Sequence, residues 1–148
     1  MLGGVWRWGL GNCYNKRMTE KLARRLVDDY VEGWVDADGS RILGSLSEDC
    51  FITESHGPMY HGPEEVKKWI DEWYQTGTVN KWNIDAFFFA KDTAFFEWSF
   101  TCTIDGRTDS IDGASVVQFK GNKIYHVHEY RMTQPAFDYF SSEQKQKH

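Results

Sequence analysis

The stretch that decides the fold runs from Tyr30 to Gly62 and reads YVEGWVDADGSRILGSLSEDCFITESHGPMYHG. Its beginning continues a run from Leu22 to Val35 in which apolar residues recur at helical spacing. This run follows Thr19, a favourable N-cap, and stops near Gly39, which suits a left-handed C-terminal position. The pattern predicts a long amphipathic helix, followed by a short helical segment over residues 40–46.

The second half of the stretch has the composition of a hairpin. Residues 50–55 are rich in β-forming types, and His56-Gly57-Pro58 turns the chain toward a brief strand over residues 59–61. Gly62-Pro63-Glu64-Glu65 then has proline and acidic residues where a helix starts. We expect this third helix to end at Gly77.

From Val79 onward the pattern has a period of two residues, which indicates strands. Turn dipeptides at residues 91–92, 105–106 and 121–122 divide this region into a four-stranded antiparallel meander. The predicted fold class is therefore α+β, with three N-terminal helices packed on a curved, mostly antiparallel sheet.

Length and composition favour one domain. A chain of 148 residues with 41% hydrophobic content can bury one core. We assign residues 19–134 to this domain, residues 1–18 to an N-terminal extension and residues 135–148 to a C-terminal tail. The aromatic content of 16% exceeds what a small core needs and indicates an aromatic-lined pocket or interface.

Charge and cysteine content narrow the function classes. The net charge is -5, and residues 1–25 hold six of the basic residues but only one acid, so the predicted domain is acidic and nucleic acid is an unlikely partner. Cys13, Cys50 and Cys102 form no disulfide framework, which favours a reducing cytoplasm. No apolar run approaches the ~20 residues of a membrane span.

The quoted stretch, the proline-started helix and the ending FKGNKIYHVHEYR at residues 119–131 resemble the nuclear transport factor 2-like superfamily, which includes the ketosteroid isomerases and SnoaL-like polyketide cyclases. The resemblance covers roughly residues 19–132. It implies a cone-shaped fold around one small-molecule pocket, with no cofactor. These motifs are specific for the fold and say little about the reaction.

Comparison with the ketosteroid isomerases implies roles for several residues. Tyr30 falls on their oxyanion-hole tyrosine and Glu54 on their catalytic base. Ser115 falls where those enzymes have a protonated aspartic acid as the second oxyanion donor, which is a departure from the steroid isomerase pattern. His56 would act as an acid or an orienting group.

The residues themselves leave alternatives open for these roles. Strand alternation places Glu54 on the same side as Ile52 and His56, where burial would raise its pKa toward that of a general base. The alternative is a rim carboxylate bonded to the backbone or to His56. Tyr30, on the buried stripe of the first helix, could equally be a core tyrosine.

The sequence FFEWSFTCT at residues 95–103 has one polar and one apolar face. The resemblance directs Glu97, Ser99 and Thr101 toward the pocket. It directs the aromatic residues outward, where they would form a homodimer interface. These aromatic residues are Phe96, Trp98 and Phe100.

The last strand can be interpreted in two ways. The resemblance favours Val127, Glu129 and Arg131 as pocket residues, with Glu129 and Arg131 balancing each other's charge. On the other face, His126 and His128 have the spacing of two metal ligands and would need a nearby carboxylate such as that of Glu54. Helix residues Trp34 and Trp73 complete the predicted pocket.

The sequence and the resemblance together predict two alternative functions. The first is an enzyme that isomerises, cyclises or dehydrates a small apolar carbonyl compound by cofactor-free acid–base chemistry. The alternative is a non-catalytic dimeric module of the same fold that binds a ligand of apolar or mixed polarity or serves in assembly.

Overall fold

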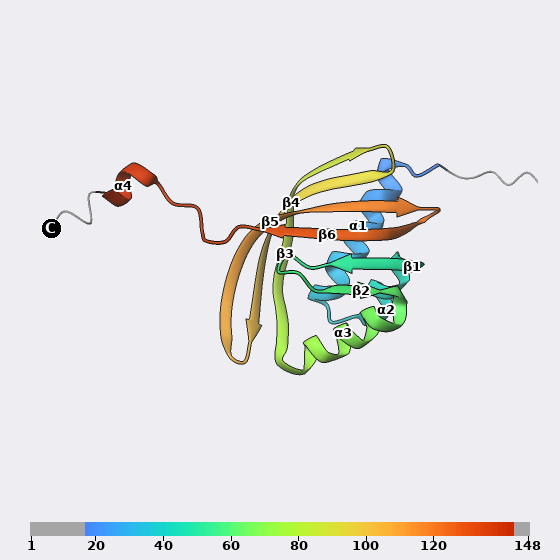
Figure 1. Cartoon of the computed structure of the whole chain (residues 1–148), viewed down its shortest axis with the longest axis horizontal. Coiled ribbons are helices and arrows are strands. Elements are labelled where there is room, and N and C mark those ends of the chain that lie inside the picture. Colours follow the sequence, from blue (N-terminus) through green and yellow to red (C-terminus); the bar gives the residue numbers. More distant parts are fainter. Residues whose placement is uncertain (1–16, 144–148) are drawn as a thin grey trace, which may run out of the picture.

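Three N-terminal helices gather on one side of a curved six-stranded sheet, and a fourth, short helix extends away at the C-terminal end (Figure 1). The computed structural model describes residues 17–143, so nearly all of the predicted N-terminal extension lies outside the described residues. The predicted domain boundaries stay a prediction. The elements are α1 (Glu20–Val35), α2 (Gly39–Ser45), β1 (Leu46–Thr53), β2 (Met59–His61), α3 (Gly62–Thr76), β3 (Gly77–Ala90), β4 (Thr93–Ile104), β5 (Arg107–Lys120), β6 (Lys123–Arg131) and α4 (Tyr139–Glu143).

The strand order is β2-β1-β6-β5-β4-β3. The β3–β6 region is the predicted antiparallel meander, and β1 joins it through a parallel pairing with β6. Left-handed backbone conformations at Lys91, Asp92, Asp105, Gly106 and Gly121 make the predicted turns. The α+β fold class is confirmed.

Helix α1 begins as predicted, because the Leu22 amide donates to the Thr19 hydroxyl over 3.2 Å. Its end differs from the prediction. Ala37, with φ of 54°, takes the left-handed conformation, whereas Gly39 starts α2. The close approach of α2 explains this tight connection, since a Cβ atom at Gly33 would lie 2.7 Å from the side chain of Ile42.

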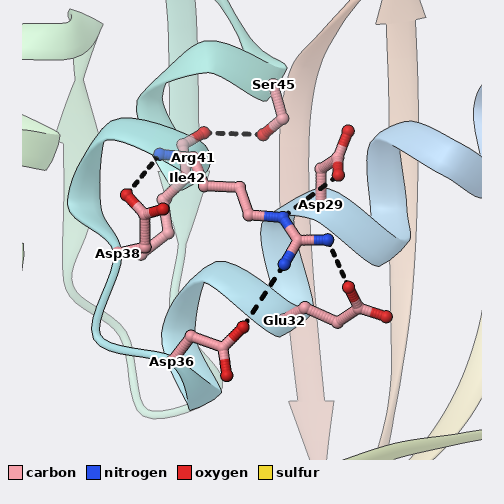
Figure 2. Close-up of polar contacts among 7 residues, drawn as sticks. All are labelled: Asp29, Glu32, Asp36, Asp38, Arg41, Ile42 and Ser45. Atoms are coloured by element: carbon pink, nitrogen blue, oxygen red, sulfur yellow. Dashed lines mark hydrogen bonds and ion pairs between the residues drawn. The ribbon is translucent and has the colours of Figure 1, made fainter.

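Ion pairs hold α2 against the polar side of α1 (Figure 2). The Arg41 guanidinium contacts Asp29 at 3.1 Å, Asp36 at 3.3 Å, and also Glu32. Asp38 caps α2 by accepting from the Arg41 amide. Each exposed pair alone stabilises little, but one guanidinium shared by three carboxylates fixes the orientation of the two helices.

The orientation of β4 is the reverse of the predicted one. Phe96 and Trp98 are only 3% and 5% exposed, because they face the helices, while Glu97 between them faces solvent. The sheet side that the helices cover must be the apolar side. The prediction that Phe96, Trp98 and Phe100 form an outer dimer surface is therefore wrong.

None of the helices within residues 17–143 is long and apolar enough to cross a membrane.

Candidate active site

A cavity of about 180 Å³ opens between the helices and the inner face of the sheet. Two carboxylic acids, Glu54 and Glu129, reach it from the ends of β1 and β6. Most of its remaining surface is aromatic or aliphatic, with His56 and Arg131 as further polar side chains. The other lining residues are Trp34, Ser55, Trp69, Trp73, Val79, Trp82, Trp98, Phe100, Cys102, Ile104 and Ile111.

The helices supply one aromatic wall of the cavity. Trp34 of α1 lies 4.7 Å from Trp69 and 5.7 Å from Trp73 of α3 between ring centroids, and the rings are inclined by 59° and 76°. Tyr60 of β2 stacks on the far side of this group, 4.5 Å from Trp69. Both the inclined contacts of Trp34 and the stacked contact of Tyr60 are favourable for aromatic rings, and together they give the wall a fixed shape.

The sheet supplies the opposite wall. Trp82 of β3 lies 5.2 Å from Phe100 and 6.1 Å from Trp98 of β4, both in edge-to-face geometry. The Trp98 indole N–H donates to the Ser115 hydroxyl over 2.9 Å. The Trp98 ring also lies so close to Gly113 that a Cβ atom there would meet it at 2.4 Å. Ser115 and Gly113 thus position Trp98.

Glu54 sits in the turn between β1 and β2, where its amide donates to the carbonyl of Pro58 over 2.9 Å. Its carboxylate accepts a 2.7 Å hydrogen bond from the Tyr60 hydroxyl, and the His56 Nδ1 lies 3.7 Å from its other oxygen. Burial, with the hydrogen bond to Glu54 and the charge of Glu54, raises the pKa of Tyr60, which keeps this phenol a donor. The Glu54 side chain is only 15% exposed.

Glu129 has no hydrogen bond or ion pair with any residue that the structure describes. Its side chain keeps some surface open to the cavity but is surrounded by protein. Burial first, and the charge of Glu54 second, raise the pKa of Glu129 to about 8. The predicted charge balance with Arg131 does not form, because Arg131 is exposed and makes no ion pair within the described residues.

Tyr30 is 2% exposed and lies beside the cavity wall, with its ring 6.0 Å from Trp82. Its hydroxyl has no hydrogen-bond partner among the described residues, and neither do the indole N–H groups of Trp34 and Trp82. Burial first, then the charges of Glu129 and Glu54, raise the pKa of Tyr30, while the nearby Trp34 indole opposes this without reaching hydrogen-bond geometry. Three buried donors therefore have no acceptor among the described residues.

Residues 27–127 match the family model of the SnoaL-like domain. The chain belongs to the SnoaL-like domain family.

Several solved structures have the same fold. A protein with a ketosteroid isomerase-like fold from Catenulispora acidiphila, in complex with trimethylamine, has a TM-score of 0.65 at 16% identity, covering 71% of this chain and 83% of that one. An epoxide hydrolase of the LEH-like type from M. tuberculosis has a TM-score of 0.69 at 12% identity, covering 76% and 79%. A candidate polyketide cyclase from Pseudomonas putida has a TM-score of 0.65 at 18% identity, covering 79% and 94%.

At these identities the structural similarity establishes the fold alone. A comparison with curated protein sequences finds no match.

The SnoaL-like domain brings together six of the residues predicted for its site, and three more lie just behind the cavity surface. Ser115 and Val127 are both 1% exposed and, like Tyr30, do not line the cavity. The six that line it are Trp34, Glu54, His56, Trp73, Glu129 and Arg131.

Glu97, Ser99 and Thr101 do not reach the cavity, and their predicted placement is corrected. They alternate with the inward-facing Trp98 and so lie on the outer face of β4, where the Thr101 hydroxyl is 2.9 Å from that of Ser110. The polar face of this strand is the solvent face, because the helices require apolar contacts on the other side.

His126 and His128 also lie on the outer face. His126 Nε2 is 3.2 Å from the Thr53 hydroxyl, and His128 Nδ1 is 3.1 Å from the Tyr130 hydroxyl. No group of three side chains suited to hold a metal ion occurs within residues 17–143.

Sequence reasoning missed Tyr60 and Trp82. Tyr60 could have been found from the hairpin, because Ile52 pairs with Tyr60 across β1 and β2, and Glu54 shares the side of Ile52. Trp82 had no comparable signal, since the bulges at residues 79–81 and 84–86 of β3 shift its side-chain alternation.

Replacement of Glu129 by Gln tests its protonation through stability. Its pKa rises from 4.5 to about 8 on folding, so the folded state holds an extra proton in this window. Stability from this group is therefore greatest below the window and falls as pH rises through it. Between pH 5.5 and 8.5 we expect the free energy of unfolding of the wild type to fall by up to about 3 kcal/mol more than that of Glu129→Gln, as measured by urea denaturation.

The exposed Glu97→Gln variant is the control and should follow wild type. Parallel pH profiles for wild type and Glu129→Gln would show that Glu129 ionises normally.

Proposed function

We propose that this SnoaL-like domain is an enzyme that carries out cofactor-free acid–base chemistry on a small carbonyl compound. One observation carries the proposal: two carboxyl groups share an aromatic cavity, and the surroundings of Glu129 raise its pKa to about 8. Paired carboxyl groups in unlike surroundings supply a base and an acid at the same pH.

Glu54 is the base of this mechanism. It removes a proton from the carbon beside the substrate carbonyl, and the electron pair moves to the carbonyl oxygen. Tyr60, which donates to one oxygen of Glu54 over 2.7 Å, orients the carboxylate. His56, 3.7 Å from the other oxygen, also orients this carboxylate or acts as an acid. The proton on Glu54 can then return to another carbon or leave with a hydroxyl group.

Glu129 is the donor to the enolate oxygen. A protonated Glu129 donates a hydrogen bond from the cavity surface, while the Tyr30 hydroxyl lies buried behind that surface and does not touch the substrate. Donors fixed in an apolar site stabilise a developing oxyanion strongly. Ser115, which the resemblance implied as the second donor, instead positions Trp98, and Glu129 takes that role.

The cavity favours a compact substrate. Its volume of about 180 Å³ and its five tryptophan side chains suit a small ring system or branched chain. Isomerisation, cyclisation and dehydration all begin with proton removal beside a carbonyl, so the same residues serve each of these reactions.

One observation favours the alternative, a non-catalytic ligand-binding module. Glu54 already accepts a hydrogen bond from Tyr60 and lies near His56, so its carboxylate has partners before any substrate enters. The two functions differ in whether a bound ketone exchanges its protons.

Deuterium exchange into small cyclic ketones, followed by NMR in heavy water, separates the two functions. We expect wild type to accelerate exchange at the carbon beside the carbonyl, and Glu54→Gln to lower the enzymatic rate about 100-fold or more. Glu97→Gln, on the outer face, should keep the wild-type rate. Ketone binding without exchange would support the binding module, and full exchange by Glu54→Gln would remove Glu54 as the base.

We also propose that the protein forms a homodimer through the outer face of its sheet. Met59, Phe88 and Phe95 are 49%, 67% and 46% exposed there, and Phe88 pairs directly with Phe95. Exposed apolar groups on one face suit a self-complementary interface.

Light scattering at micromolar concentration should show a dimer for wild type and a monomer for Phe95→Glu. Phe137→Glu, exposed but outside the sheet, is the matched control and should remain dimeric. A monomeric wild type would end this proposal.

The cytoplasmic location stays a prediction. Cys50 and Cys102, the two cysteines in the described range, are free thiols, as expected in a reducing compartment.

A further inference from the structure

We propose that the ligand of this cavity carries a positively charged alkylammonium group, held by the tryptophans of both walls and by the carboxyl groups of Glu54 and Glu129. This inference names the ligand class of the same site, and it rests on the proposed function to the extent that the cavity binds a small molecule.

The tryptophan content of the cavity suits a cation. Cations bind over the faces of aromatic rings, and tryptophan is the most favourable of these. The rings of the helical wall are inclined to one another by 59° and 76°, and Trp82 is inclined by 77° and 84° to its neighbours on β4. These angles belong to rings that pack on one another, and what favours a cation is that five tryptophans line the cavity from both walls.

The charges of the cavity also favour a cationic ligand. Neither Glu54 nor Glu129 forms an ion pair with Lys or Arg anywhere in residues 17–143, and His56 lies 3.7 Å from Glu54. Arg131, the lining residue with a fixed positive charge, is exposed and does not contact either carboxyl group. A neutral carbonyl group can accept from a protonated Glu129, but it offers nothing that offsets the negative charge of an ionised carboxylate. A cationic ligand offsets that charge.

Binding of a cation should be coupled to the ionisation of Glu129. A nearby positive charge favours the ionised carboxylate, so the cation binds more tightly as pH rises toward the Glu129 pKa of about 8. The other ionisable groups that face this region are Glu54, His56, Tyr30, Tyr60, Cys102 and Arg131. Histidine is the side-chain type that ordinarily changes charge near neutral pH, so His56 is replaced as a control.

Choline and 3,3-dimethylbutan-1-ol test the proposal, because they share one shape and differ in charge. Isothermal titration calorimetry at pH 8.5 should show choline binding about tenfold more tightly, in the range of desolvated cation–π contacts. Choline affinity should fall when pH is lowered to 6.5, and the neutral alcohol should bind equally at both values. Glu129→Gln should remove most of this pH dependence, and His56→Gln should retain it.

Arg131→Gln gives a prediction of opposite sign. Removal of a positive charge from the cavity mouth should leave choline affinity unchanged or raise it, whereas Glu129→Gln should lower it at pH 8.5.

The outcomes separate this inference from the proposed function. If the alcohol binds as tightly as choline, the charge preference is refuted, while ketone exchange can still establish the enzyme. If choline does not bind at all, the inference is also refuted. If neither compound binds and no ketone exchanges its protons, the inference and the proposed function both fail.

Discussion

Packing of the large side chains of β4 against the helices decides where the other features of this protein lie. Phe96 and Trp98 turn inward, and Trp98 lies over Gly113 and donates to Ser115 of the neighbouring strand. Ser115 pairs in turn with Glu129 of β6, so these opposed residues point to the same side of the sheet. The register that packs Trp98 thus carries a carboxyl group into the apolar interior.

The chemistry of the site follows from that burial. A carboxyl group without a charged partner is less costly in an apolar site when it keeps its proton, and the charge of Glu54 adds to the same effect. Glu54 differs because Tyr60 and His56 surround it with polar atoms. The two carboxyl groups thus have unlike surroundings in one cavity, and the proposed acid–base function depends on this difference.

The sequence predicted the helices, the turns and the meander, because local signals such as Thr19, Pro63 and the turn dipeptides determine them. It also indicated Glu54 and Glu129 as pocket residues through the family resemblance. The family resemblance gave the two faces of β4 the wrong way round, and alternation could not correct this, because it shows that a strand has two faces but not which one the helices cover. The contact of Tyr60 with Glu54 depends on hairpin register, and the protonation of Glu129 depends on atoms from several strands and helices, so neither is visible in local sequence.

The chemistry proposed for this cavity requires Glu129 to hold a proton near neutral pH. Carbon NMR of protein labelled at the glutamate carboxyl positions measures this directly, with Glu129→Gln identifying the resonance. We expect this carboxyl group to titrate near pH 8. Titration of the Glu129 resonance below about pH 5, in the usual range of glutamate, would contradict it.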